Sequence, residues 1–159
     1  MIDTQNAHCP PVVALLTDFG LRDGFVGVMK GVILSRAPAA KIIDISHDVH
    51  PFDVPSAAFL LDWSFPYLPS GSVITVVIDP GVGTLRDILV LDAFERRFVF
   101  PDNGVISRVW SRECQERRLV CAKNRSLWLD MVSSTFHGRD IFSPLAAHLA
   151  NGGELSEIG

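Results

Sequence analysis

The sequence predicts an α/β domain: a mostly parallel β-sheet with helices on both faces, in three α/β/α layers. Short, continuous apolar runs such as Val12–Leu16 are typical of strands that are buried on both faces of a sheet. Helical stretches separate these runs at the spacing of βαβ units. The chain has 159 residues, of which 48% are hydrophobic, and this suits one domain with a sizeable core.

Strands and helices alternate along the chain. The β-branched run Ser72–Ile78 has the strongest strand pattern. The stretch Val54–Trp63 is helical, with Pro55 near the first turn, where proline is tolerated, and the preceding helix ends before Pro38. In chain order, the predicted elements are strand Val12–Leu16, helix Gly24–Arg36, strand Lys41–Ile45, helix Val54–Trp63, strand Ser72–Ile78, a hairpin of Ile88–Leu91 and Arg97–Phe100 that turns through Ala93–Arg96, a helical turn at Val105–Trp110, strand Leu119–Ala122 and helix Asp140–Ala150.

The first predicted helix carries glycines on one face. Gly24, Gly27 and Gly31 are spaced three and four residues apart, so they line up along the helix. Each glycine inside a helix costs about 0.8–1 kcal/mol relative to alanine. We expect close packing of this helix against the sheet to offset that cost, and room for a ligand or partner is the alternative.

Composition and charge exclude several classes of protein. The net charge of −4 argues against a nucleic-acid-binding surface. No apolar run reaches the length of about 18 residues that a membrane helix needs, and the N-terminus lacks the basic and apolar parts of a signal peptide. Cys9, Cys114 and Cys121 show no CxxC spacing and are expected to be reduced thiols. These features predict a cytoplasmic protein without nucleic-acid or membrane partners.

A polar, glycine-bearing or histidine-bearing loop follows each of the first three predicted strands. In open α/β sheets, ligands bind outside the carboxyl ends of the strands, so these loops are expected to meet at one edge of the sheet. Two later segments have the same character. The five loops are Thr17–Asp23, Ser46–Asp53, Asp79–Arg86, Phe100–Gly104 and Ser134–Asp140.

Simpler interpretations of these loops stay open. Asp-Phe-Gly and Pro-Asp-Asn-Gly are good turn sequences, and Asp48 or Asp53 could cap a helix. The GVG after the third strand is neither a P-loop nor a GxGxxG motif. HxH, HExxH and DxD spacings are absent from the sequence, so we predict no metal site. The side chains that would be plausible ligands are Asp18, His47, His50, Asp79, Asp102 and His137.

Five segments resemble, in order and spacing, the motifs of one enzyme family. The chain resembles the S-adenosyl-L-methionine (SAM) hydroxide adenosyltransferases, which are SAM hydrolases related to the SAM-dependent fluorinase and chlorinase. The resemblance assigns residues 1–11 to an N-terminal tail and 12–159 to the family's N-terminal α/β domain. The segments are TDFGLRDGFVGVMKGVI from Thr17, ISHDVHPFDVPSAAFLL from Ile45, VVIDPGVGTLR from Val76, FPDNGVIS from Phe100 and STFHGRDIFSPLAAHLA from Ser134.

The resemblance implies a reaction and an assembly. Family members cleave SAM at the ribose C5′ to adenosine and methionine, with water or hydroxide as nucleophile. SAM is then the substrate, and neither a cofactor nor a metal is implied. The family also has a C-terminal β-rich domain, which this chain is expected to lack, and its site forms between the subunits of a homotrimer.

The resemblance also implies roles for particular residues. The Asp, Arg and His set of the hydrolase branch corresponds to Asp79, Arg86 and His137. Val82 and Gly138 occupy positions at which the halogenase branch has a threonine and a serine that contact the halide. Asp79 occupies a position at which the fluorinase has an aromatic residue. These differences favour hydroxide as the nucleophile. The expected substrate-binding residues are Asp18, Asp23, Phe52, Gly81, Val82 and Gly138.

The proton path within the catalytic set stays open. Asp79 is the natural general base, although a carboxylate is a weak one, and a nearby Arg86 would chiefly orient it. His137 is better matched as a proton acceptor near neutral pH. Gly81 and Gly83 would let the backbone approach a ligand. The alternative functions are a catalytically silent SAM- or adenosine-binding or oligomerisation domain, a SAM-dependent halogenase, and a metal-dependent hydrolase.

Overall fold

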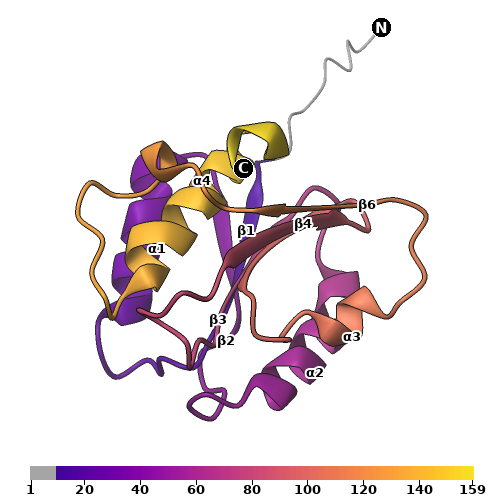
Figure 1. The fold of residues 1–159 in the computed structure, drawn as a ribbon, viewed down its shortest axis with the longest axis horizontal. Coiled ribbons are helices and arrows are strands. Elements are labelled where there is room, and N and C mark those ends of the chain that lie inside the picture. Colours follow the sequence, from indigo (N-terminus) through magenta and orange to yellow (C-terminus); the bar gives the residue numbers. More distant parts are fainter. Residues whose placement is uncertain (1–9) are drawn as a thin grey trace, which may run out of the picture.

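The computed structural model describes residues 10–159, so most of the predicted tail 1–11 and Cys9 lie outside the described residues (Figure 1). Within that part of the chain, no helix is both long and apolar enough to cross a membrane. The strands are β1 (Val12–Thr17), β2 (Lys41–Ser46), β3 (Val73–Val77), β4 (Ile88–Ala93), β5 (Arg96–Pro101) and β6 (Arg117–Cys121). The helices are α1 (Phe25–Arg36), α2 (Val54–Ser64), α3 (Ser107–Trp110) and α4 (Ser143–Ala150), with a π-helical turn at Gly138–Phe142 and short 3₁₀ turns at Phe65–Tyr67, Arg125–Leu127 and Leu155–Glu157.

The six strands form one sheet in the order β2-β1-β3-β5-β4-β6. The pairs β1–β2, β1–β3 and β3–β5 are parallel, whereas β4 runs antiparallel to β5 and β6. The predicted α/β fold is therefore confirmed, with a sheet that is mostly but not purely parallel. The antiparallel part begins at the predicted hairpin, where Phe94 and Glu95 have φ of 55° and 56°. A two-residue turn with both φ values positive matches the twist of the strands that it joins.

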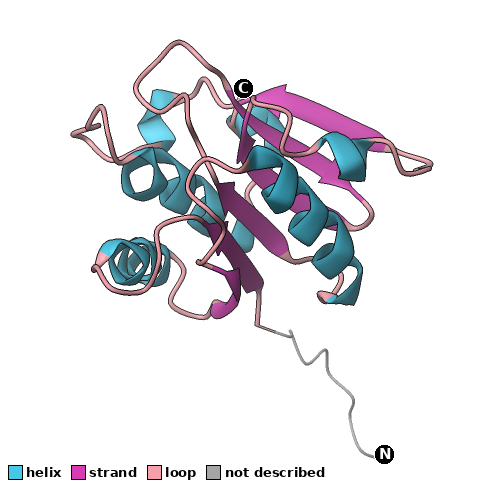
Figure 2. Ribbon diagram, turned by 90° about the horizontal axis from the view of Figure 1, so that it is seen from below, coloured by secondary structure: helices cyan, strands magenta, loops and turns pink. Residues whose placement is uncertain are grey.

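The residues of β1 explain how the sheet is covered. Val13 and Leu15 belong to one buried cluster with residues of α1 and α4, and Ala14 and Leu16 belong to another with residues of α2 and α3. Because successive side chains of a strand point to opposite faces, the continuous apolar run supplies both clusters. Figure 1 shows α1 with α4 beside one face and α2 with α3 beside the other, and Figure 2 shows the same sheet from below.

The glycine face of α1 is not packed against the sheet. A Cβ atom built at Gly24, Gly27 or Gly31 would meet no other atom within 4 Å. The helix instead buries Val26, Met29 and Ile33, with all three glycines exposed on the other side. The expectation of close packing is therefore wrong, because the spacing shows which residues share a face but not which face is buried.

The closing helix is not regular over its predicted length. Its first turn, Gly138–Phe142, is π-helical, and the N–H and hydroxyl of Ser143 both donate to the carbonyl of Gly138. Pro144 has no N–H to give to the carbonyl of Asp140, four residues earlier. That carbonyl accepts from the N–H of Leu129 instead, at 2.9 Å. The preceding loop is thereby attached to the start of the helix, next to His137.

Candidate active site

Loops from four parts of the chain meet around one cavity at the carboxyl ends of β1 and β3. We call this cavity, of about 280 Å³, the aromatic cavity. Phe19, Phe25 and Phe136 form its wall, with ring centroids 5.0–6.0 Å apart and mostly edge-to-face contacts. The predicted site residues that line it are Asp18, Phe52, Asp79, Val82, His137 and Gly138.

The carboxylate of Asp79 is held by the arginine that follows it by seven residues. Asp79 is 6% exposed, and the Nε of Arg86 lies 3.1 and 2.9 Å from its two oxygens. Nη2 of Arg86 also donates to Oδ2, and the N–H of Gly81 donates to Oδ1 at 3.2 Å. The planar guanidinium matches a carboxylate in this forked geometry, and the paired hydrogen bonds compensate for the burial of the acid. The predicted pairing of these two residues is present.

His137 joins this pair from a segment 51 residues further along the chain. Its Nδ1 lies 2.8 Å from Nη2 of Arg86. Because a guanidinium only donates hydrogen bonds, Nδ1 must accept, and the ring proton then resides on Nε2. Burial lowers the pKa of His137, and the charge of Arg86 lowers it further, which agrees with a neutral ring. This geometry differs from the expectation that His137 accepts the proton, since Arg86 already occupies the free lone pair.

Two glycines of the β3 loop make room for protein groups. Gly83 has φ of 77°, and a Cβ there would lie 2.4 Å from the carbonyl oxygen of Ser134. A Cβ at Gly81 would lie 3.0 Å from Cγ of Arg86. The expected approach of a ligand to these glycines is replaced by the approach of a side chain and of a neighbouring loop. Neither Gly81 nor the exposed Asp23 lines the aromatic cavity.

Asp18 holds the aromatic residue at the rim of the cavity. Its Oδ2 accepts from the N–H of Phe52 at 2.8 Å. Phe52 has φ of 63°, which strains a residue with a side chain, and its ring is 62% exposed. Burial raises the pKa of Asp18, and the nearby charge of Asp79 raises it further, although the Phe52 N–H partly offsets the effect. The site thus keeps two carboxylates close together.

Replacement of Asp18 by asparagine should raise the melting temperature at pH 7, by at most a few degrees. The folded-state pKa of Asp18 lies above its unfolded value, so its contribution to stability is lost as the pH rises through that folded-state pKa. Asparagine cannot ionise and keeps an oxygen for the Phe52 N–H. Thermal unfolding at pH 7 and pH 3 measures the difference. The rise in melting temperature should be smaller at pH 3. An equal rise at both pH values would contradict the raised pKa of Asp18.

Other predicted polar residues lie away from the cavity. His47 is 3% exposed, and its Nδ1 lies 2.8 Å from the hydroxyl of Thr17, so it supports the end of β1. Asp53 caps α2, as one simpler interpretation allowed, since it accepts from the N–H of Ser56 at 3.0 Å. Between residues 10 and 159, no group of three or more His, Cys, Asp or Glu side chains is placed to hold a metal.

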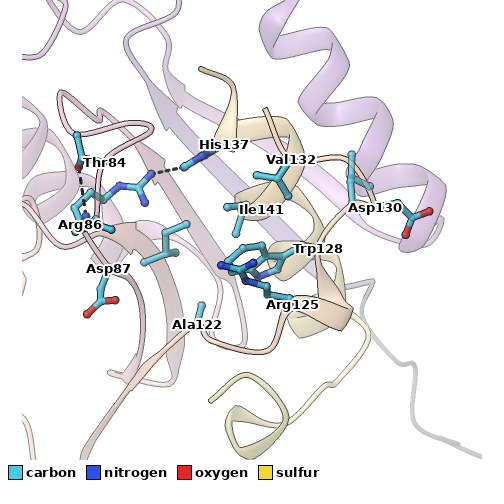
Figure 3. A pocket seen from close by; sticks show the side chains of 13 residues that line it. Thr84, Arg86, Asp87, Ala122, Arg125, Trp128, Asp130, Val132, His137 and Ile141 are labelled. Carbon is cyan, nitrogen blue, oxygen red and sulfur yellow. Dashed lines mark hydrogen bonds between the residues drawn. The ribbon is translucent and has the colours of Figure 1, made fainter. Parts of the chain in front are cut away.

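A second cavity, of about 630 Å³, adjoins the first, and we call it the polar cavity (Figure 3). Asp79 lines only the aromatic cavity, Arg86 lines only the polar cavity, and His137 lines both. Arg125 and Trp128 of the polar cavity were not predicted from the sequence, and neither was the aromatic wall of the other one. Phe19, Phe25 and Phe136 lie within the family motifs, but the motifs do not show that the three rings meet, because that contact arises only through the fold.

Comparison with known proteins identifies the family. The sequence model of the SAM hydroxide adenosyltransferase N-terminal domain matches residues 13–159. The chain belongs to this family. The resemblance drawn from its five motifs is therefore confirmed.

The relatives of this family member include hydrolases and fluorinases. The chain is 43% identical over 150 residues to the (R)-S-adenosyl-L-methionine hydrolase of Salinispora tropica, covering 94% of the chain and 57% of that relative. It is 40% identical over 148 residues to the enzyme of the same name from Thermus thermophilus, covering 88% and 57%. A fluorinase from an Actinoplanes species is 25% identical over 177 residues, covering 96% and 59%. The chain thus spans a little over half the length of these curated relatives.

Solved structures agree with the fold of this SAM hydroxide adenosyltransferase domain. A crystal structure of a conserved protein from Thermotoga maritima superposes with a TM-score of 0.86 at 43% identity, covering 92% of this chain and 56% of the other. A conserved protein from Thermus thermophilus gives a TM-score of 0.76 at 36% identity, covering 94% and 57%. Both likenesses extend over nearly all of the described residues.

Proposed function

We propose that the complete protein hydrolyses SAM at the ribose C5′, giving adenosine and L-methionine, with water as the nucleophile. The observation that carries this proposal is the chain of contacts from Asp79 through Arg86 to His137 at the border of the aromatic cavity. Relatives at 38–43% identity that are named (R)-S-adenosyl-L-methionine hydrolase support it. SAM is the substrate in this proposal, and the reaction needs no cofactor.

The charge of the aromatic cavity suits a cationic substrate. Asp18 and Asp79 carry two negative charges, which Arg86 neutralises only in part, while His137 is neutral. The sulfonium of SAM is positive, and its attraction to the excess negative charge is strong where water is displaced. The aromatic wall offers apolar contact to the rest of a nucleoside. Contacts of Asp18 and Phe52 with the ribose and adenine are part of the proposal.

Each member of the catalytic set has its own task in the proposed nucleophilic substitution. The Asp79 carboxylate orients the water and takes its proton as the bond from oxygen to C5′ forms. The C5′–S bond breaks, and its electron pair leaves with the thioether of methionine. Arg86 positions the carboxylate, and His137 positions Arg86. Because a sulfonium and a hydroxide-like nucleophile lose charge together, a dry cavity favours the transition state.

The wider features of the proposal rest on the family. Val82 and Gly138 line the aromatic cavity without a hydroxyl, which suits water better than a halide as the nucleophile. Asp23, which lies outside that cavity, would contact a more distant part of the substrate. We further propose a cytoplasmic homotrimer in which a C-terminal β-rich domain completes the site. The length of the curated relatives beyond the matched region is consistent with such a domain.

Incubation of the purified complete protein with SAM in H₂¹⁸O should give adenosine that carries ¹⁸O at the 5′ position, together with methionine. Chromatography with mass detection measures both products. Formation of 5′-chloro-5′-deoxyadenosine in proportion to added chloride would instead indicate a halogenase. Calorimetric binding of SAM without any product would indicate a silent binding domain. Either result would overturn the proposed hydrolysis.

A further inference from the structure

Trp128, which lines the polar cavity, has a buried hydrogen-bond donor without a partner. The Nε1 atom of Trp128 is buried and has no hydrogen-bond acceptor among residues 10–159. An unsatisfied buried N–H costs roughly 1–3 kcal/mol, and buried indoles usually find a partner. The ring of Trp128 lines the polar cavity, while its Nε1 atom is covered by protein atoms.

Two guanidinium groups border the same cavity. The guanidinium of Arg125 lies 5.5 Å over the ring of Trp128 and forms no hydrogen bond or ion pair with any described residue. Arg86 uses Nε and Nη2 for Asp79 and His137, while its Nη1 has no partner in the described part of the chain. Figure 3 shows Arg86 reaching in from one side, with Arg125 and Trp128 across the cavity. Two guanidinium groups with unused N–H donors therefore border one space, together with the ring of Trp128.

The carboxylates near this cavity do not meet these donors. Asp87 and Asp130 are both exposed, and Figure 3 shows their carboxylates at the periphery, turned away from the space between Arg86 and Trp128. Asp87 lies near Cys121, whose thiol pKa is raised by burial first and by the Asp87 carboxylate second. Arg86 is already paired with Asp79, so within residues 10–159 the cation of this cavity that lacks an acidic partner is Arg125.

The remaining walls indicate the kind of anion. Ala122, Leu129, Val132 and Ile141 give the cavity an apolar side, and its volume of about 630 Å³ exceeds the needs of a small inorganic ion. We propose that the polar cavity binds a small organic carboxylate with a short apolar chain. The carboxylate contacts Arg125 and Nη1 of Arg86, beside the ring of Trp128, since guanidinium groups bind carboxylates through paired charge-assisted hydrogen bonds. This site is separate from the aromatic cavity and does not depend on SAM cleavage.

Titration with sodium butyrate, followed in ¹H–¹⁵N NMR spectra, tests the proposal directly. The three tryptophan side chains give separate indole N–H signals, assigned by Trp→Phe variants. At constant ionic strength, butyrate should shift the Trp128 signal in a saturable manner. The signals of Trp63 and Trp110, which are 63% and 44% exposed and do not line this cavity, should stay in place. Butyramide tests the apolar chain without charge, and sulfate tests charge without the chain.

Two arginine variants separate this site from general charge effects. Arg125→Gln should weaken butyrate binding by about tenfold, which corresponds to roughly 1.4 kcal/mol. Arg108→Gln is the matched control, because Arg108 also lies 5.5 Å over a ring, that of Phe59, away from the cavity. The proposal is overturned if butyrate gives no saturable shift, if butyramide or sulfate shifts Trp128 as strongly, or if Arg125→Gln binds butyrate as the unaltered protein does.

Discussion

Replacement of Gly83 by alanine should both destabilise the domain and separate His137 from Arg86. The added Cβ would lie 2.4 Å from the backbone oxygen of Ser134, at a residue with φ of 77°. A non-glycine residue in the left-handed region costs about 1–2 kcal/mol, and displacement of the opposing loop adds a similar amount. The free energy of unfolding should therefore fall by roughly 2–4 kcal/mol. Urea unfolding measures the stability, and adenosine formation from SAM measures the activity.

Gly71→Ala is the matched control for that variant. Gly71 has φ of 81°, but a Cβ there would meet no atom within 4 Å. The Gly71→Ala variant therefore has only the conformational cost. Its free energy of unfolding should fall by roughly 1–2 kcal/mol, with its activity intact. Equal losses of stability and activity in both variants would show that the contact between the two loops is not what holds the site together.

Asp79→Asn should reduce turnover of SAM by about 10²–10⁴-fold and should also weaken SAM binding, by a smaller factor, because it removes one of the two carboxylate charges of the aromatic cavity. The amide keeps an oxygen that can accept from Arg86, but it cannot take a proton from water. Single-turnover formation of adenosine measures the chemical step, and calorimetry with SAM measures binding. A variant with near-normal turnover would remove Asp79 from the role of general base.

Two changes at His137 decide whether this residue acts on the water or on Arg86. His137→Ala removes the acceptor and should lose most turnover. His137→Asn places an amide oxygen near the position of Nδ1, where it can accept from Arg86 although it has no basicity. We expect the asparagine variant to retain much more turnover than the alanine variant. Equal losses in both would assign the proton-accepting role to His137.

Much of the fold could be predicted because its signals are local. The apolar run of β1 indicates a strand with two buried faces, and the segment around Phe94 and Glu95 indicates a turn between two short strands. The face on which a helix is buried is a tertiary property, which is why the glycines of α1 were assigned to the wrong side. The sequence shows that Pro144 cannot donate to the carbonyl of Asp140, but it does not show that Leu129 donates there instead or that the turn before it is π-helical.

The candidate site could be predicted in its residues but not in its contacts. Family motifs point to Asp79, Arg86 and His137, yet the direction of the hydrogen bond at Nδ1 is visible only in three dimensions. The phenylalanines of the aromatic wall carry no chemical signal in the sequence. Neither does Trp128, whose unpartnered N–H becomes apparent only once the fold encloses it.

The contact between the Gly83 and Ser134 loops has a consequence for the timing of folding. Arg86 and His137 are 51 residues apart, so their hydrogen bond closes a long stretch of chain. Contacts of such sequence separation form late, after local helices and hairpins. Because the 133–137 segment lies outside the sheet, we expect it to open locally while the sheet stays intact. Catalytic competence would therefore be the last property that the domain acquires on folding and the first that it loses on warming.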